Sequence, residues 1–113
     1  MREKAMREVI LVQLGALRAD AGVEQVACKD TCVGDYLTGK ADALAVTMQM
    51  VEAKAMIESM VHFLRHEETR NMNLAESARL AGKDTMARLR EGAAAGYMAA
   101  SRVVTEIREM NKS

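Results

Sequence analysis

The chain has 113 residues, half of them apolar, with sixteen basic and sixteen acidic side chains and no proline. This size and composition indicate one folded domain and exclude a largely disordered chain, because an apolar half is enough to form a core. The balanced charge disfavours a partner recognised mainly by charge, such as nucleic acid or an anionic membrane.

Residues 2–20 are predicted to form an amphipathic helix, because apolar residues recur at helical spacing and charged residues occupy the other side. The apolar positions are Met6, Val9, Ile10, Leu14 and Leu17. Charged residues interrupt the apolar run, so we expect no cleaved secretory signal. No stretch reaches the roughly 18 to 20 uncharged residues of a membrane span. These features predict a cytoplasmic protein.

Residues 21–34 are predicted to be a connection, because they lack a clear period and contain Gly22 and Gly34. Asp35 follows, and its side-chain oxygen is placed to cap the free amides of a helix. We therefore expect a second helix over residues 35–68.

The predicted helix 35–68 carries apolar residues on two opposite sides. One stripe consists of Ala43, Val46, Met50, Ala53, Ile57, Met60 and Leu64, and the other of Leu37, Ala41, Leu44, Met48, Val51 and Ala55. Both sides must be covered, since each exposed stripe would leave apolar surface in water. The pattern predicts a central helix with two partners.

The polar residues 67–71 predict a tight turn, and Asn73 with Glu76 has the spacing of a capping box. A third helix is expected over residues 73–110. Its apolar stripe keeps its phase across Gly82, which predicts a continuous helix. In the middle, Gly92 and Gly96 predict a close crossing with another helix backbone.

These elements predict an all-α fold, an elongated antiparallel hairpin of two long helices with a shorter N-terminal helix. Each long helix would measure about 50 Å, which exceeds a compact globule of this size. One short helix cannot cover the remaining apolar surface, so we expect self-association to complete a helical bundle. The residues expected at a seam between copies, or with another protein, are Leu37, Leu44, Met48, Val51, Gly92, Gly96 and Ala99.

Two pairs of metal-ligand residues share a spacing of four, Cys28 with Cys32 and His62 with His66. Together they form the mixed thiolate and imidazole set that zinc prefers. The long second helix would separate the pairs by about 40 Å, so only two chains could close the site. The alternatives are a Cys28–Cys32 disulfide or reduced cysteines and solvated histidines without any metal.

No phosphate-binding loop, nucleophile elbow or zinc-protease motif is present, so we expect no catalytic activity and no cofactor other than the zinc alternative. One helix opening resembles those of short helical proteins from bacteriophages and prophages. This motif is Tyr36-x-x-Gly39-Lys40-Ala41-x-Ala43-Leu44. The resemblance implies an accessory protein that blocks or adapts a larger partner, in the host cytoplasm if a phage encodes it.

The leading hypothesis is therefore a noncatalytic, homo-oligomeric helical module that binds another protein. A zinc-stabilised structural protein with an intersubunit site is the alternative. Nucleic-acid binding through the basic residues of the third helix is least favoured, because acidic residues are interspersed among them.

Overall fold

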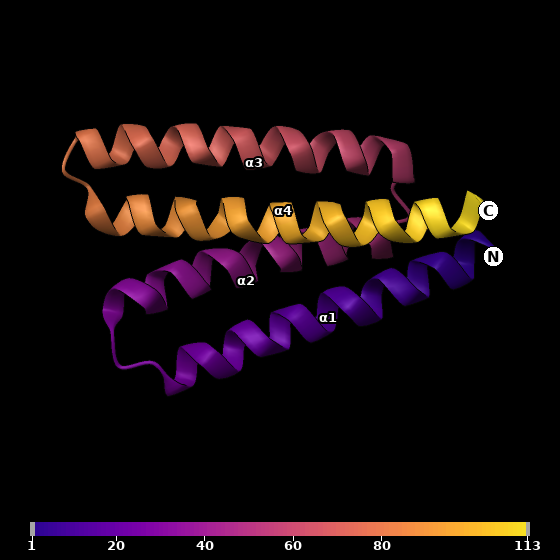
Figure 1. The fold of residues 1–113 in the computed structure, drawn as a ribbon, viewed down its shortest axis with the longest axis horizontal. Coiled ribbons are helices and arrows are strands. Elements are labelled where there is room, and N and C mark those ends of the chain that lie inside the picture. The colour runs from indigo at the N-terminus through magenta and orange to yellow at the C-terminus, as the bar shows by residue number, and fades with distance from the viewer. Residues whose placement is uncertain (1, 113) are drawn as a thin grey trace.

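The computed structural model describes residues 2–112, and these form four helices and no strand. The helices are α1 (Glu3–Ala27), α2 (Thr31–Glu52), α3 (Ile57–Leu80) and α4 (Asp84–Lys112). Successive helices run in opposite directions, so the start of α1 and the end of α4 lie at the same end of the molecule (Figure 1). The all-helical prediction is confirmed, but four shorter helices replace the hairpin of two long ones.

The predicted helix 35–68 is wrong because the chain turns after Glu52. Lys54 adopts a left-handed conformation, with φ of 60°. Its amide donates to the Val51 carbonyl at 3.0 Å, and the Ala55 amide donates to the Met50 carbonyl at 3.0 Å. This pair of bonds is a Schellman motif, which normally has glycine at the left-handed position. A lysine there gave no sequence signal for a helix end.

The predicted continuity of residues 73–110 is also wrong, because a second Schellman motif ends α3. Gly82 has φ of 73°. Its amide donates to the Arg79 carbonyl at 3.1 Å, and the Lys83 amide donates to the Ala78 carbonyl at 2.8 Å. The apolar stripe keeps its phase across a turn as well as across a continuous helix, so phase alone did not reveal the break.

Two predicted connections are likewise displaced. The segment 21–34 is mostly helical, and only residues 28–30 connect α1 to α2. The cap of α2 is Asp30, whose Oδ1 accepts the Cys32 amide at 2.8 Å, and not Asp35. The expected turn over residues 67–71 lies inside α3, where Thr69 and Arg70 are exposed on the helix surface and Asn71 is buried.

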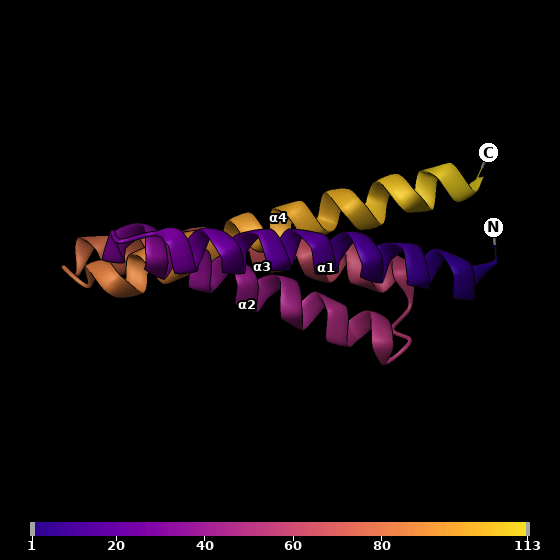
Figure 2. The same cartoon turned by 90° about the horizontal axis from the view of Figure 1, so that it is seen from below.

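Helix α4 packs against each of the other three helices, and α2 packs against both α1 and α4. The expectation that the helix after residue 35 is covered on two sides is therefore confirmed for α2. The helices α2 and α4 are close at one end and separate toward the end that holds the termini (Figure 2). The core between them contains side chains from all four helices, including Ile10, Val51, Met60 and Val104.

Glycines allow the close crossing of α2 and α4. A Cβ atom on Gly39, Gly92 or Gly96 would collide with backbone atoms of the facing helix. The close approach predicted at Gly92 and Gly96 is thus present, and it occurs within one chain. With a radius of gyration of 14.7 Å, the molecule does not have the overlong rods on which the expectation of self-association was based.

Candidate functional site

The predicted metal ligands are not brought together within one chain. Cys28 ends α1 and Cys32 lies in the first turn of α2, whereas His62 and His66 are exposed on α3. The α1–α2 turn and the start of α3 lie at opposite ends of the bundle (Figure 1). Among residues 2–112, no group of three or more histidine, cysteine, aspartate or glutamate side chains is placed to hold a metal.

The cysteine turn is held by local hydrogen bonds. The Asp30 amide donates to Cys28 Sγ at 3.3 Å, and Cys28 Sγ donates to the Asp30 carbonyl at 3.2 Å. Both cysteines are free thiols, Cys28 half-buried and Cys32 exposed. The structure therefore contains neither the proposed disulfide nor a single-chain zinc site, and the version of that site shared between two chains stays a prediction.

The residues expected at an interaction seam lie inside the fold. Leu37, Leu44 and Val51 are buried in the single chain, and half-buried Met48 packs against the core. Gly92 and Gly96 are buried against α2, and Ala99 is half-buried on α4. These seven residues pack within the single chain, and a role for them at a seam between copies or with another protein stays a prediction.

A groove of about 350 Å³ lies between α2 and α3, with α4 as its floor. We call it the α4 groove. It is lined by Gly39, Asp42, Ala43 and Val46 of α2, by Glu67, Arg70 and Asn71 of α3, and by Met86, Leu89, Arg90, Ala93 and Tyr97 of α4. The sequence prediction missed it because α2 and the first half of α3 were assigned to one helix, residues 35–68, and the end of α3 was assigned to the same helix as α4, residues 73–110.

Exposed apolar side chains surround this groove. Val46 and Met86 line it and remain partly open to solvent, and Phe63 is exposed on α3 beside Tyr97. The rings of Phe63 and Tyr97 meet edge to face, with centroids 6.3 Å apart and an interplanar angle of 89°. Such a pair is favourable and fixes the orientation of both rings. The groove therefore offers a preformed apolar surface.

A polar network holds the α3 wall of the groove in place. Arg90 Nη1 donates to Asn71 Oδ1 at 3.1 Å, and Asn71 Nδ2 donates to the Glu67 carbonyl at 2.8 Å. Arg70 forms an ion pair with Glu67 at 3.1 Å. Asn71 is only 2% exposed, so losing one of its partners would leave a buried polar atom unsatisfied. This network fixes α3 against α4 along the groove.

Burial raises the pKa of the Tyr97 phenol above its ordinary value of 10.0, and the nearby Glu67 carboxylate adds to the rise. Arg70 and Arg90 act in the opposite direction with smaller effects. The phenol therefore remains protonated at neutral pH and can donate a hydrogen bond at the groove.

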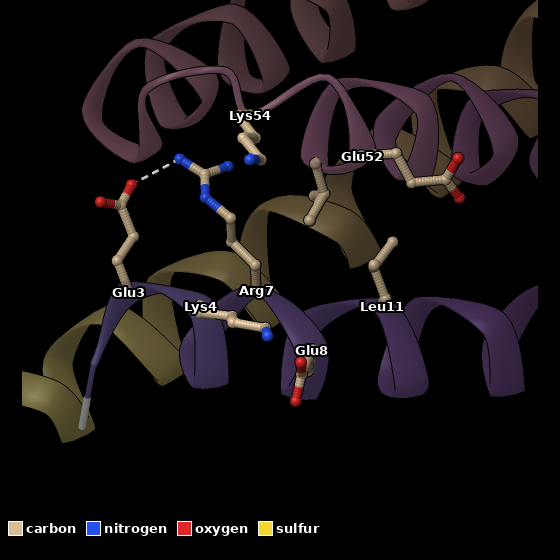
Figure 3. Close-up of a pocket in the computed structure, with 8 residues that line it drawn as sticks. Glu3, Lys4, Arg7, Glu8, Leu11, Glu52 and Lys54 are labelled. Carbon is tan, nitrogen blue, oxygen red and sulfur yellow. Dashed lines mark hydrogen bonds and ion pairs between the residues drawn. The ribbon is translucent and has the colours of Figure 1, made fainter.

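A second cavity, of about 580 Å³, lies between the start of α1 and the end of α2. In Figure 3, Arg7 rises from α1 toward Lys54 in the α2–α3 connection. Arg7 Nη2 pairs with Glu3 at 2.6 Å, while its buried Nη1 has no hydrogen-bond partner among the described residues. The lining includes three basic and three acidic side chains, so no charge of one sign dominates. A water molecule or a single carboxylate oxygen would satisfy Nη1.

Comparison of the chain with protein-family models, with curated proteins and with solved structures gives no match. Within residues 2–112, no helix combines the length and the apolar character that a membrane-spanning helix needs.

Proposed function

We propose that the protein is a noncatalytic, homo-oligomeric helical module that binds a helix of another protein in the α4 groove. The observation that carries this proposal is the position of Val46 on the α2 wall and of Met86 on the α4 floor, two exposed apolar side chains that line one preformed groove. An amphipathic helix placed between two helices buries its apolar side against such a floor. Burial of these side chains supplies the driving force.

The charges at the groove suggest the chemistry of the partner helix. Asp42 is exposed on the α2 wall and forms no hydrogen bond or ion pair with the described residues. On the opposite wall, Arg70 and Glu67 already pair with each other. A partner helix with a lysine or arginine beside its apolar stripe would meet Asp42, and this pairing would set its orientation more than its affinity.

We keep the role of an accessory protein, which blocks or adapts a larger partner, as part of this proposal. The phage-like motif that implied it lies in α2, where Gly39 packs closely against α4. Because that position has a structural role in the crossing, the motif supports the fold more strongly than it supports a phage origin.

The test is photo-crosslinking in the cells that naturally make the protein. A crosslinking amino acid at Val46 should capture one discrete partner, and Met86→Glu should abolish the adduct by placing a charge on the groove floor. The matched control is a crosslinker at Val33, an exposed valine at the start of α2 outside the groove.

Once the adduct identifies the partner, the purified proteins provide the quantitative test. Met86→Glu should weaken binding at least about tenfold, equal to about 1.4 kcal/mol. Equal adducts from Val33 and Val46, or binding that is insensitive to Met86→Glu, would contradict the proposal. An absence of any adduct at Val46 would contradict it as well.

A further inference from the structure

The cavity between the start of α1 and the end of α2 holds a buried guanidinium group that is only partly satisfied. The Arg7 side chain is 11% exposed, and its Nη2 atom pairs with Glu3 at 2.6 Å. Its Nη1 atom is buried and has no hydrogen-bond partner among the described residues. A buried charged donor without an acceptor is destabilising, so the position of Nη1 indicates that an acceptor binds here.

A second cation lines the same cavity from the α2–α3 connection. Lys54 is part of the lining, and the Arg7 side chain rises toward it (Figure 3). The Lys54 side chain forms no hydrogen bond or ion pair with the described residues. Two positive charges at one cavity repel each other, and an anion that lies between them is attracted by both.

The backbone of Lys54 gives an independent reason to assign it a role. Among residues 2–112 it is the only residue other than glycine with a left-handed conformation, at φ of 60°. Glycine usually occupies this place in a Schellman motif, because a Cβ atom disfavours the conformation. Residues held in such conformations are concentrated at ligand sites. A lysine here lowers the stability of the turn and supplies a positive charge to the cavity.

The cavity has the size and the lining of a small-molecule site. Its volume of about 580 Å³ lies within the usual range of ligand pockets. Leu11 of α1 and Val51 of α2 also line it, and Leu11 is partly exposed. Cations beside apolar side chains suit a ligand that has an anionic group and an apolar body.

We propose that this cavity binds a small organic monocarboxylate. One carboxylate oxygen accepts a hydrogen bond from Arg7 Nη1, and the other oxygen meets the ammonium group of Lys54. The apolar body of the acid contacts Leu11. Hydrogen bonds between charged groups are about twice as strong as neutral ones. The inference goes beyond the proposed function and does not depend on the α4 groove.

The charges around the cavity favour a monocarboxylate over phosphate. Three acidic and three basic side chains line the cavity, so their charges sum to zero. A phosphate dianion would therefore bring a second negative charge close to the lining carboxylates. Glu3 already pairs with Arg7 Nη2, so the guanidinium cannot offer both terminal nitrogens to phosphate. A carboxylate oxygen needs only the nitrogen that remains.

A methyl NMR titration with sodium hexanoate is the first experiment. Hexanoate should shift the methyl signals of Leu11 and Val51, with a saturable dissociation constant of about 1 mM or less. The methyl signals of Val46 and Met86 in the α4 groove should not respond. Hexylamine is the matched control ligand, because it has the same apolar chain without the anion, and it should not bind saturably.

Two outcomes of this titration would overturn the chemistry of the site. Equal binding of hexylamine and hexanoate would show that the apolar chain alone is recognised. Tighter binding of inorganic phosphate than of hexanoate would show that the site does not select a carboxylate.

Substitutions separate binding from folding. Lys54→Gly should weaken hexanoate binding about threefold, although it removes the left-handed conflict and so maintains or raises stability. Lys83→Gly is the matched control, because Lys83 is an exposed lysine in the α3–α4 turn, and it should leave binding unchanged. Glu3→Gln should strengthen binding several-fold, because it removes a competing carboxylate from Arg7.

Arg7→Met should abolish saturable binding, because the buried donor is lost. Circular dichroism shows whether each variant is folded. If Arg7→Met does not fold, the opposite effects expected for Lys54→Gly and Glu3→Gln still decide the matter. A lack of saturable shifts at about 10 mM hexanoate would overturn the site. Binding that neither Lys54→Gly nor Glu3→Gln changes would overturn it as well.

Discussion

Gly96 of α4 lies directly against Lys40 of α2, so that a Cβ atom added to Gly96 would stand 2.6 Å from the Lys40 carbonyl oxygen. Backbone atoms cannot move aside as the end of a flexible side chain can. The crossing of α2 and α4 that forms one end of the α4 groove therefore depends on the absence of a side chain at this position.

Gly96→Ala should destabilise the fold by about 1 to 3 kcal/mol, the usual effect of overpacking a close contact. Gly22→Ala is the matched control, because Gly22 is also helical but no atom lies near its Cβ position. Alanine should stabilise α1 there by about 0.5 to 1 kcal/mol. Denaturant unfolding of both variants measures the difference, and equal effects would show that the helices are not this close.

Lys54 and Gly82 both have a left-handed backbone conformation, and substituting them should change the stability of the fold in opposite directions. Gly82→Ala should destabilise the fold by about 1 to 2 kcal/mol, because a Cβ disfavours the left-handed conformation. Lys54→Gly should be neutral or stabilising by a fraction of that amount, since it removes the same conflict. Thermal unfolding provides the measurement. A stabilising Gly82→Ala would instead indicate the continuous helix expected from the sequence.

The part-buried hydrogen bond between Arg90 and Asn71 should show energetic coupling. Asn71→Ala should destabilise the fold by about 1 to 3 kcal/mol, because it leaves a charged donor without its acceptor. Once Arg90→Met has removed that donor, the effect of Asn71→Ala should be smaller. A double-mutant cycle measured by denaturant unfolding gives the coupling. Strictly additive effects would show that the hydrogen bond contributes nothing.

Tyr97 should make the fold sensitive to alkaline pH. Because its pKa is raised in the folded state, the protonated phenol is favoured by folding, and its contribution is fully present below the unfolded value of 10.0. That contribution should be lost as pH rises from about 10 through the higher folded pKa. Tyr97→Phe should reduce the alkaline loss of stability, whereas Tyr36→Phe serves as the control. Identical alkaline profiles for the two variants would contradict the assignment.

The sequence predicted the features that depend on periodicity and residue size. Helical composition predicted the fold class, and the two apolar sides of α2 predicted that two other helices pack against it. Gly92 and Gly96 predicted the close crossing of two helices. These inferences succeeded because burial and close approach depend directly on side-chain size and spacing.

The helix ends could not be obtained in the same way. Lys54 adopts a conformation that glycine usually takes, and Gly82 interrupts a stripe without changing its phase. Asn71 was assigned to a turn, although it is a buried residue of α3 that binds Arg90. With two helix ends missed, the groove between α2 and α3 could not be predicted, because it exists only when α3 and α4 are separate helices.

Methyl NMR spectra of the protein with the partner captured at Val46 test the central proposal most directly. Binding in the α4 groove should shift the methyl signals of Val46 and Met86 and leave those of Met56 and Met72, which lie outside the groove, unchanged. Shifts confined to Met56 or Met72, with Val46 and Met86 unaffected, would contradict the proposal that the α4 groove is the binding site.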